Sequence, residues 1–220
     1  MPTSTCYMCD SPETSRKHAP PLCFFPEAKE VGRDLRRNLI TVPSCERHNS
    51  RKSKDDEYFR SVILMTVAPN SDTGRHQFNR KLLRAADRTP HAHRLFFADK
   101  GTIAEGKERV LQIDRERFDA CIDHLARALF FDAFHRKWSL PISVYSPNFF
   151  SGIDSDQVVP HQLTQDTVEV SRQVLGPEPI RGENPEVFKY RLRYDKTDET
   201  YNFWAMFYDY FEIYSFSSKH

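Results

Sequence analysis

Four potential metal ligands, arranged as two short pairs, constrain this chain more than any other feature. The first pair is Cys6-x-x-Cys9, and the second is Cys45-x-x-His48. Structural Zn²⁺ is held tetrahedrally by nitrogen and sulfur ligands, and two such pairs from distant segments complete a site. The spacing therefore predicts a Cys₃His zinc site that fastens the intervening segment at both ends. Soft thiolate ligands favour zinc or iron over hard cations.

Cysteine usage argues against a disulfide framework. The chain has five cysteines, an odd number, and its first residues do not form an apolar signal peptide. We therefore expect metal-bound thiolates in a reducing cytoplasm. Cys121 lies in an apolar helical pattern, which predicts a core position. Cys23 is expected to pack against apolar neighbours as well.

Charge is unevenly distributed along the chain. The formal net charge is only +1, so total charge does not predict a polyanion binder. Residues 16–54, however, carry ten Lys and Arg against four Asp and Glu. A basic N-terminal half suits a phosphate backbone, and an ordinary solvated surface is the alternative. No stretch approaches the ~20 apolar residues of a membrane span, so no membrane partner is expected.

Polar residues of catalytic type lie inside or next to the segment that the ligand pairs enclose. His18 precedes two prolines, which favour an extended end of a strand, and its ordinary pKa suits a general base. Asn38 begins an apolar, β-branched run that ends at Pro43. This run predicts a short strand that pairs with the His18 segment. Asn49 opens a polar stretch with helical character, so the expected order is strand, strand, helix.

This arrangement resembles the HNH endonucleases, or ββα-metal nucleases, in their zinc-stapled form. The matching stretches are Cys6-Tyr7-Met8-Cys9, Lys17-His18, Asn38 to Cys45, and Glu46-Arg47-His48-Asn49. They span roughly the first quarter of the chain. The resemblance implies an α+β protein with a treble-clef-like HNH module over residues 1–62. A larger helical and antiparallel β region, residues 63–220, would serve specificity or partner docking.

The resemblance also implies a reaction, which is metal-dependent hydrolysis of phosphodiester bonds in DNA, with RNA as an open alternative. His18 matches the general base, and Asn38 matches the residue that orients this base. Asn49 matches a ligand of a catalytic Mg²⁺ or Mn²⁺ ion, and the zinc would be separate and structural. By analogy with the family, the chain is also expected to be the effector subunit of a bacterial anti-phage defence complex with a sensor partner.

Two positions depart from the family pattern. His48 replaces the usual fourth cysteine, which zinc tolerates. Lys17 replaces the acidic or histidine residue that contacts the catalytic metal, and an ammonium group cannot ligate Mg²⁺. Three explanations stay open: Lys17 points away and Asp55 or Asp56 supplies the carboxylate, Lys17 contacts the phosphate itself, or the site is catalytically weak. The last gives a zinc-containing nucleic-acid-binding or partner-dependent module.

A core helix is predicted in the middle of the chain. Asp114 is a suitable N-cap, and an apolar stripe at spacings of three and four continues to about Trp138. The stripe contains Phe118, Ile122, Leu125 and Leu129. Asp123 and His124 are expected on the surface of this helix. Residues 61–95 are predicted to be helical with a break at 68–71, either as a basic helix along nucleic acid or as an ordinary amphipathic helix, and His91 and His93 are expected in a linker.

The C-terminal part has the pattern of a sheet. Residues 142–145 form a short apolar run, and residues 188–194 alternate between apolar and basic side chains. Residues 200–216 are rich in aromatic side chains. These patterns predict antiparallel strands that pack on the core helix. The aromatic side chains are expected in the core or at an interface, with base stacking as the alternative.

Overall fold

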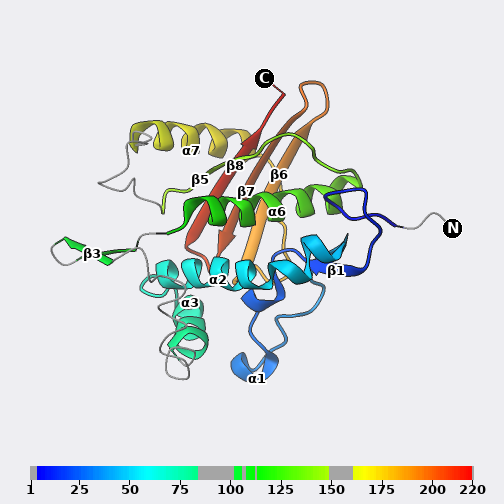
Figure 1. Ribbon diagram of the computed structural model, residues 1–220. Helices are drawn as coiled ribbons and strands as arrows, with labels where there is room; N and C mark the ends of the chain where they lie inside the picture. The colour runs from blue at the N-terminus through cyan, green and yellow to red at the C-terminus, as the bar shows by residue number, and fades with distance from the viewer. Residues whose placement is uncertain (1–3, 84–101, 106–107, 112, 149–160, 220) are drawn as a thin grey trace.

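The computed structural model describes residues 4–83, 102–105, 108–111, 113–148 and 161–219 (Figure 1). The protein is mixed α+β, as the sequence predicts. One long helix, α6 (Arg115–Phe134), lies between a four-stranded sheet on one side and the N-terminal elements on the other (Figure 1). None of the described helices is both long and apolar enough to cross a membrane.

The N-terminal region combines a two-stranded hairpin, short helical turns and one longer helix. In chain order its elements are β1 (Ser15–His18), η1 (Leu22–Phe24), α1 (Ala28–Val31), β2 (Thr41–Ser44), η2 (Glu46–His48), η3 (Ser50–Lys52) and α2 (Ser53–Val67). β1 pairs antiparallel with β2, and His18 lies opposite Thr41, so the predicted pairing is confirmed. β2 begins later than Asn38, because Asn38 has a φ of 51°, which is outside the extended region.

The predicted break after α2 is confirmed. The next elements are α3 (Asp72–Gln77) and the π-helical η4 (Phe78–Leu83). Ser71 starts α3, because its Oγ accepts a hydrogen bond from the Gly74 amide (3.1 Å), which satisfies a donor at the helix start. The remainder of the predicted basic stretch, beyond residue 83, and the histidines at 91 and 93 lie outside the described residues.

α6 begins and packs as its sequence pattern predicts. The Asp114 carboxylate accepts a hydrogen bond from the Arg117 amide (3.1 Å) and caps the first turn. The helix ends at Phe134, earlier than the predicted Trp138, because His135 adopts the left-handed conformation with a φ of 53°. Cys121 is buried, as predicted. The helix contacts the sheet through Tyr201 and the N-terminal region through Tyr7, so it is packed on two sides.

The sheet is antiparallel and has the strand order β5-β8-β7-β6. Its strands are β5 (Ser143–Tyr145), β6 (Phe188–Asp195), β7 (Thr200–Phe207) and β8 (Phe211–Ser217). The Tyr201 hydroxyl donates to the Ala126 carbonyl of α6 (3.0 Å). α7 (His161–Leu175) lies against the other face, where its Arg172 bonds to the Tyr214 hydroxyl (2.9 Å). A separate hairpin is formed by β3 (Thr102–Glu105) and β4 (Glu108–Leu111).

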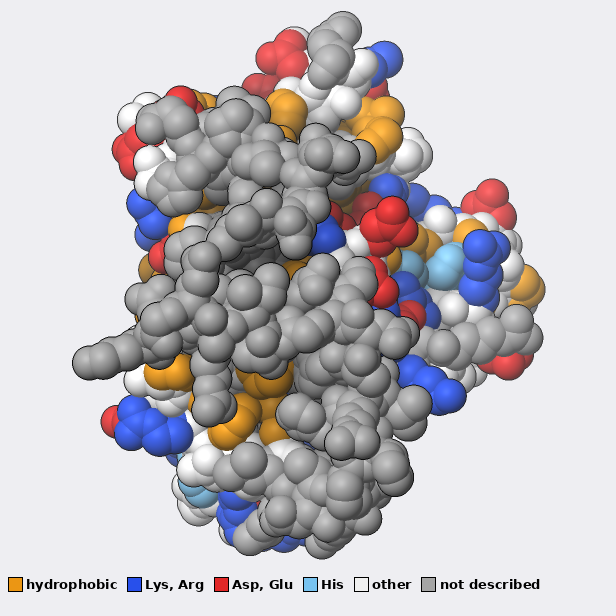
Figure 2. Space-filling view, turned by 60° about the vertical axis from the view of Figure 1, so that its left-hand side comes forward, with side chains coloured by type: hydrophobic (Ala, Val, Ile, Leu, Met, Phe, Trp, Pro, Cys, Tyr) orange, Lys and Arg blue, Asp and Glu red, His pale blue; other side chains and the backbone are white. Residues whose placement is uncertain are grey.

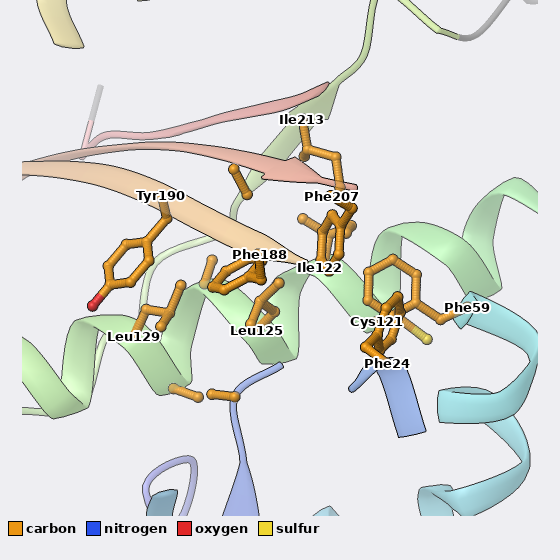
Figure 3. Close-up of a cluster of buried hydrophobic side chains, with 14 of the residues drawn as sticks. Phe24, Phe59, Cys121, Ile122, Leu125, Leu129, Phe188, Tyr190, Phe207 and Ile213 are labelled. Carbon is orange, nitrogen blue, oxygen red and sulfur yellow. The ribbon is translucent and has the colours of Figure 1, made fainter. Parts of the chain in front are cut away.

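One buried cluster joins the two sides of the molecule. Phe24 and Phe59 from the N-terminal region meet Phe207 of β7 near α6 (Figure 3), with ring centroids 5.0 and 5.6 Å from that of Phe207. The Tyr208 hydroxyl donates to the Phe24 carbonyl (2.7 Å). The expectation of a core role is thereby confirmed for Phe207 and the other buried aromatic residues of β7. α2 runs through residue 62, and the division of the chain there stays a prediction.

Candidate metal centre and adjoining pocket

The four predicted zinc ligands converge in the structure. The thiol sulfurs of Cys6, Cys9 and Cys45 and Nδ1 of His48 all lie within 4.8 Å of one another. The Cys9 and Cys45 sulfurs are 3.8 Å apart, and Nδ1 is 3.4 Å from the sulfurs of Cys6 and Cys45. Tetrahedral zinc with bonds of ~2.3 Å to sulfur and ~2.1 Å to nitrogen gives edges of about 3.8 and 3.5 Å. The group therefore has the dimensions to hold a metal ion such as zinc.

Local backbone bonds produce this convergence. The Tyr7 amide donates to the Pro43 carbonyl (2.8 Å), which fixes the first ligand pair against β2. Cys45 follows β2 directly, and the tight turn η2 brings His48 back, with its amide donating to the Cys45 carbonyl (3.1 Å). Burial, together with nearby Arg47 and Lys52, lowers the pKa of His48. The imidazole is then neutral near pH 7, which is the form that ligates metals.

Contacts with α6 and with the segment just beyond it connect the metal centre to the rest of the protein. Lys137, just beyond α6, donates to the Cys9 carbonyl (2.7 Å) and pairs with Asp10 (2.9 Å). The Tyr7 hydroxyl hydrogen-bonds with Nδ1 of His124 on α6 (3.0 Å). A third contact is made by a predicted ligand itself, because the ring of His48 lies 5.6 Å from that of His124 between centroids. The centre is therefore held against α6 and the segment just beyond it.

His124 was expected on the surface, and that prediction is wrong. Its side chain is half-buried, and burial, with the surrounding cations led by Lys52, lowers its pKa to about 3. Asp123 is also only half-exposed and pairs with Arg127 (2.8 Å). The physical reason is that α6 is packed on two sides, so that its polar side faces the N-terminal region instead of water.

His18 ends β1 beside a small pocket between the N-terminal region and α6. The pocket has room for about one water molecule. Its polar lining consists of Lys17, His18, Lys52, Asp56 and His124, and α6 supplies apolar side chains. Burial, followed by the charges of Lys17 and Arg36, lowers the pKa of His18. The neutral imidazole, which can accept a proton, is therefore favoured near pH 7.

Lys17 points into this pocket. Only 6% of its side chain is exposed, and its Nζ lies 3.0 and 3.2 Å from the two carboxylate oxygens of Asp56 on α2. Burial raises the pKa of Asp56, an effect that Lys17 partly offsets. Asp55, the other carboxylate considered for this site, instead pairs with Arg117 of α6 (2.8 Å). The structure thus brings Lys17 and His18 together with Asp56.

The two asparagines of the predicted site lie elsewhere. Asn49 donates through Nδ2 to the Ser15 hydroxyl (2.8 Å) and the Arg16 carbonyl (3.2 Å), and so fastens the start of η3 to β1. Asn38 is exposed and precedes β2. Within the described residues its side chain has no hydrogen-bond partner, and neither asparagine belongs to the pocket lining. Their predicted roles stay predictions.

The residues of the pocket do not fit a catalytic Mg²⁺ or Mn²⁺ ion. Such ions take oxygen ligands, chiefly carboxylates. Asp56 is the one carboxylate in the described lining of the pocket, and both of its oxygens already face the Lys17 ammonium. In the described parts of the chain, only the Cys₃His group gathers three or more residues that could hold a metal.

Sequence reasoning missed the contribution of α6 to this pocket. A signal for His124 existed, because it is three residues after Cys121 and four before Ala128, and both neighbours are buried. A helix position flanked in this way lies on a packed face. Lys52 was counted only within the basic segment, and nothing in its local pattern distinguished it from the neighbouring cations.

Basic side chains do not gather into one positive surface on the face shown in Figure 2. Among the described residues in that view, Lys and Arg side chains are interspersed with Asp and Glu. The local concentration of positive charge is instead found inside the pocket, where Lys17 and Lys52 share the lining with one carboxylate.

No protein-family model, curated protein or solved structure matches this chain. The resemblance to HNH endonucleases is therefore carried by the quoted residues alone. The structural features that bear on function are the Cys₃His group and the pocket beside it.

Proposed function

We propose that this protein hydrolyses phosphodiester bonds in nucleic acid, with His18 as the general base. The observation that carries the proposal is the position of His18, which ends a strand of the metal-fastened hairpin and lines a pocket that also contains two lysines. A neutral histidine suits proton abstraction, and ammonium groups suit a phosphate. The sequence resemblance favours DNA as the substrate.

In the proposed reaction His18 accepts a proton from a water molecule. The water oxygen forms a bond to phosphorus as the bond between phosphorus and the 3′-oxygen breaks, and the departing oxygen takes a proton from solvent. Negative charge develops on the phosphoryl oxygens, and positive groups placed beforehand stabilise such charge. Lys17 and Lys52 are the pocket residues of that kind. General-base assistance typically contributes about 10²–10⁴-fold to the rate.

Zinc has a structural role in this proposal. Cys6, Cys9, Cys45 and His48 would hold it, and all four positions are then used by protein ligands, which is typical of structural sites. A zinc ion bound there would link the β1–β2 hairpin to η2 and hold both in place. His18 depends on it indirectly, because β2, which pairs with the strand of His18, leads directly into Cys45.

The test is cleavage of plasmid DNA, single-stranded DNA and RNA by the zinc-loaded protein. His18→Ala is expected to lower the cleavage rate at least 100-fold. The matched control is His76→Ala, which removes an exposed imidazole on α3 whose hydrogen-bond partner among the described residues is the Glu30 carbonyl (3.2 Å). Equal rates for His18→Ala and the parent protein would contradict the role of His18. Absence of cleavage on all substrates would contradict the proposed activity.

A second candidate is a zinc-containing module that binds nucleic acid without cleaving it, or that acts only with a partner. The observation that favours it is the Lys17–Asp56 pair, which stands where an acidic metal ligand is expected. Cleavage that begins only when a sensor protein is added would support the partner-dependent form and the role of a defence effector. Binding without cleavage in every condition would support the silent form.

A further inference from the structure

We propose that the Lys17 ammonium takes the place of a divalent cation in this pocket, so that the site excludes Mg²⁺ and Mn²⁺ and works without them. The inference deepens the proposed function and rests on it for the consequence in catalysis. The exclusion of ions, by contrast, is a property of the folded pocket and can be measured without any cleavage.

The geometry of Lys17 is that of a bound cation. Its Nζ faces both oxygens of Asp56, at 3.0 and 3.2 Å, and its side chain is almost completely removed from solvent. A charge-assisted contact of this kind is short and strong. A divalent ion would have to use the same two oxygens, and Lys17 could not leave them without placing an ammonium group in a buried, uncompensated position.

The surrounding charges strengthen the exclusion. Lys52 lines the same pocket, with only 17% of its side chain exposed. A divalent ion placed beside Asp56 would therefore face two ammonium groups in a site that water screens poorly. His18 and His124 are the other polar residues of the lining, and an imidazole, neutral or protonated, adds no negative charge.

Lys17 retains donor capacity toward a substrate. An ammonium group has three N–H donors, and the two Asp56 oxygens account for at most two of them. The remaining donor can meet one phosphoryl oxygen, which is about the size of the water molecule that the pocket has room for. Lys17 and Asp56 neutralise each other. Lys52 lies 3.9 Å from Asp55, which also pairs with Arg117, so the cations around the pocket exceed the carboxylates by one positive charge. The anionic oxygen of a phosphodiester, presented at this pocket, suits such a site better than a divalent cation does.

The deciding experiment is an Mn²⁺ titration of the zinc-loaded protein, observed as paramagnetic broadening of the His18 ring signals by NMR. The parent protein is expected to show no saturable broadening of His18. Lys17→Met is expected to gain an Mn²⁺ site with at least tenfold tighter binding than the parent, and Lys17→Met/Asp56→Asn is expected to lose it. Lys54→Met, on an exposed position of α2, is the matched control and is expected to behave as the parent.

Saturable broadening of His18 in the parent protein would overturn the inference, and so would a folded Lys17→Met variant that gains no Mn²⁺ site. Zinc content and circular dichroism establish whether each variant is folded. If Lys17→Met does not fold, the titration of the parent protein decides alone.

The catalytic consequence is tested by cleavage in buffer freed of Mg²⁺ and Mn²⁺ on a chelating resin, with retained zinc verified by elemental analysis. Cleavage at an equal rate with and without added Mg²⁺ is the expected result. Cleavage that requires Mg²⁺ would overturn the inference and leave the proposed function intact. Absence of cleavage in both buffers would contradict the proposed function, while the Mn²⁺ titration would still decide whether the pocket excludes divalent ions.

Discussion

The two sides of α6 are packed by different physical means. Toward the sheet, the helix buries large aromatic side chains: Phe130, for example, has its ring centroid 5.0 Å from that of Tyr201. Toward the N-terminal region, Phe118 packs on Phe59 with ring centroids 5.2 Å apart, and the helix adds separate polar contacts, such as His124 with Tyr7 (3.0 Å) and Arg117 with Asp55 (2.8 Å). The first kind of contact depends on buried area, and the second on the placement of individual atoms.

This difference indicates which side of α6 depends on a bound metal and on single contacts for its stability. Aromatic packing against the sheet needs nothing except the folded chain. Before α2, the N-terminal side uses short strands and turns, with the four-residue strands β1 and β2 as its only hairpin among the described elements. Small elements of this kind bury little apolar area and commonly need a metal or a disulfide. We therefore expect the two sides of α6 to respond differently to metal removal and to single substitutions.

If the Cys₃His group holds zinc as proposed, removal of the ion is expected to have the largest effect, because binding of a structural zinc ion is worth roughly 10–16 kcal/mol and is coupled to folding. Chelation, or the substitution Cys9→Ser, should make the segment before α2 sensitive to protease while β6, β7 and β8 stay protected from hydrogen exchange. Cys23→Ser is the control, since Cys23 is a thiol outside the Cys₃His group. An N-terminal segment that stays protease-resistant without metal would show that the N-terminal side of α6 does not depend on a bound metal.

Phe207→Ala is expected to destabilise both sides together, by about 4 kcal/mol. Phe207 is fully buried and is the point where the aromatic core of the sheet reaches Phe24 and Phe59 of the N-terminal region. The free energy of unfolding in urea measures the effect. Phe216→Ala, at a 40% exposed position on the neighbouring strand, should change it by less than about 0.5 kcal/mol. A loss confined to one side would show that the two regions unfold independently.

Lys17→Met is expected to destabilise the protein by about 3 kcal/mol, because it leaves the Asp56 carboxylate half-buried without its partner. Replacement of both residues, in Lys17→Met/Asp56→Leu, should restore most of the loss, since an apolar pair of similar volume avoids the cost of burying charge. Denaturant unfolding of the two variants and of Lys54→Met gives the comparison. A double variant as unstable as the single one would show that the lost stability does not come from an unpaired Asp56 carboxylate.

The smallest expected effect concerns the pKa of His18, which burial and then Lys17 hold below the ordinary value of 6.5. A lowered pKa keeps the imidazole neutral to lower pH, so the acid limb of any cleavage profile should lie below pH 6.5. Lys17→Met removes one of the causes and should move this limb to higher pH, by less than about one unit. NMR titration of the ring measures the pKa directly. A shift to lower pH in the variant would contradict the assigned cause.

Most parts that the sequence predicted depend on neighbours in the chain, and the convergence of Cys9 with Cys45, 36 residues apart, was predicted because one metal site needs both ligand pairs. The x-x spacing of the metal ligands, the Asp114 cap and the alternation along β6 all act within a few residues. The contacts that it did not predict join distant segments. Lys17 and Asp56 are 39 residues apart, and Tyr7 and His124 are 117 apart.

The contact of His124 with Tyr7 arises because α6 is packed on both sides, which a single apolar stripe does not reveal. The stripe predicted correctly that Phe118 and Leu125 are buried, and it gave no account of the opposite side. His124 was therefore assigned to solvent. Asn38 failed as a strand residue for a local reason, its left-handed backbone conformation, which asparagine adopts more readily than most residues do.

The bond between Tyr208 and the Phe24 carbonyl spans 184 residues of the chain, and this separation has a consequence for synthesis. Chains leave the ribosome from the N-terminus, at about 5–20 residues per second. The segment around Phe24 is therefore exposed before its partners on β7 have been made. All four metal ligands, by contrast, are present once residue 48 has emerged. A metal ion could fold the nascent N-terminal segment early and so fix the position of Phe24 before Phe207 and Tyr208 are synthesised and pack against it.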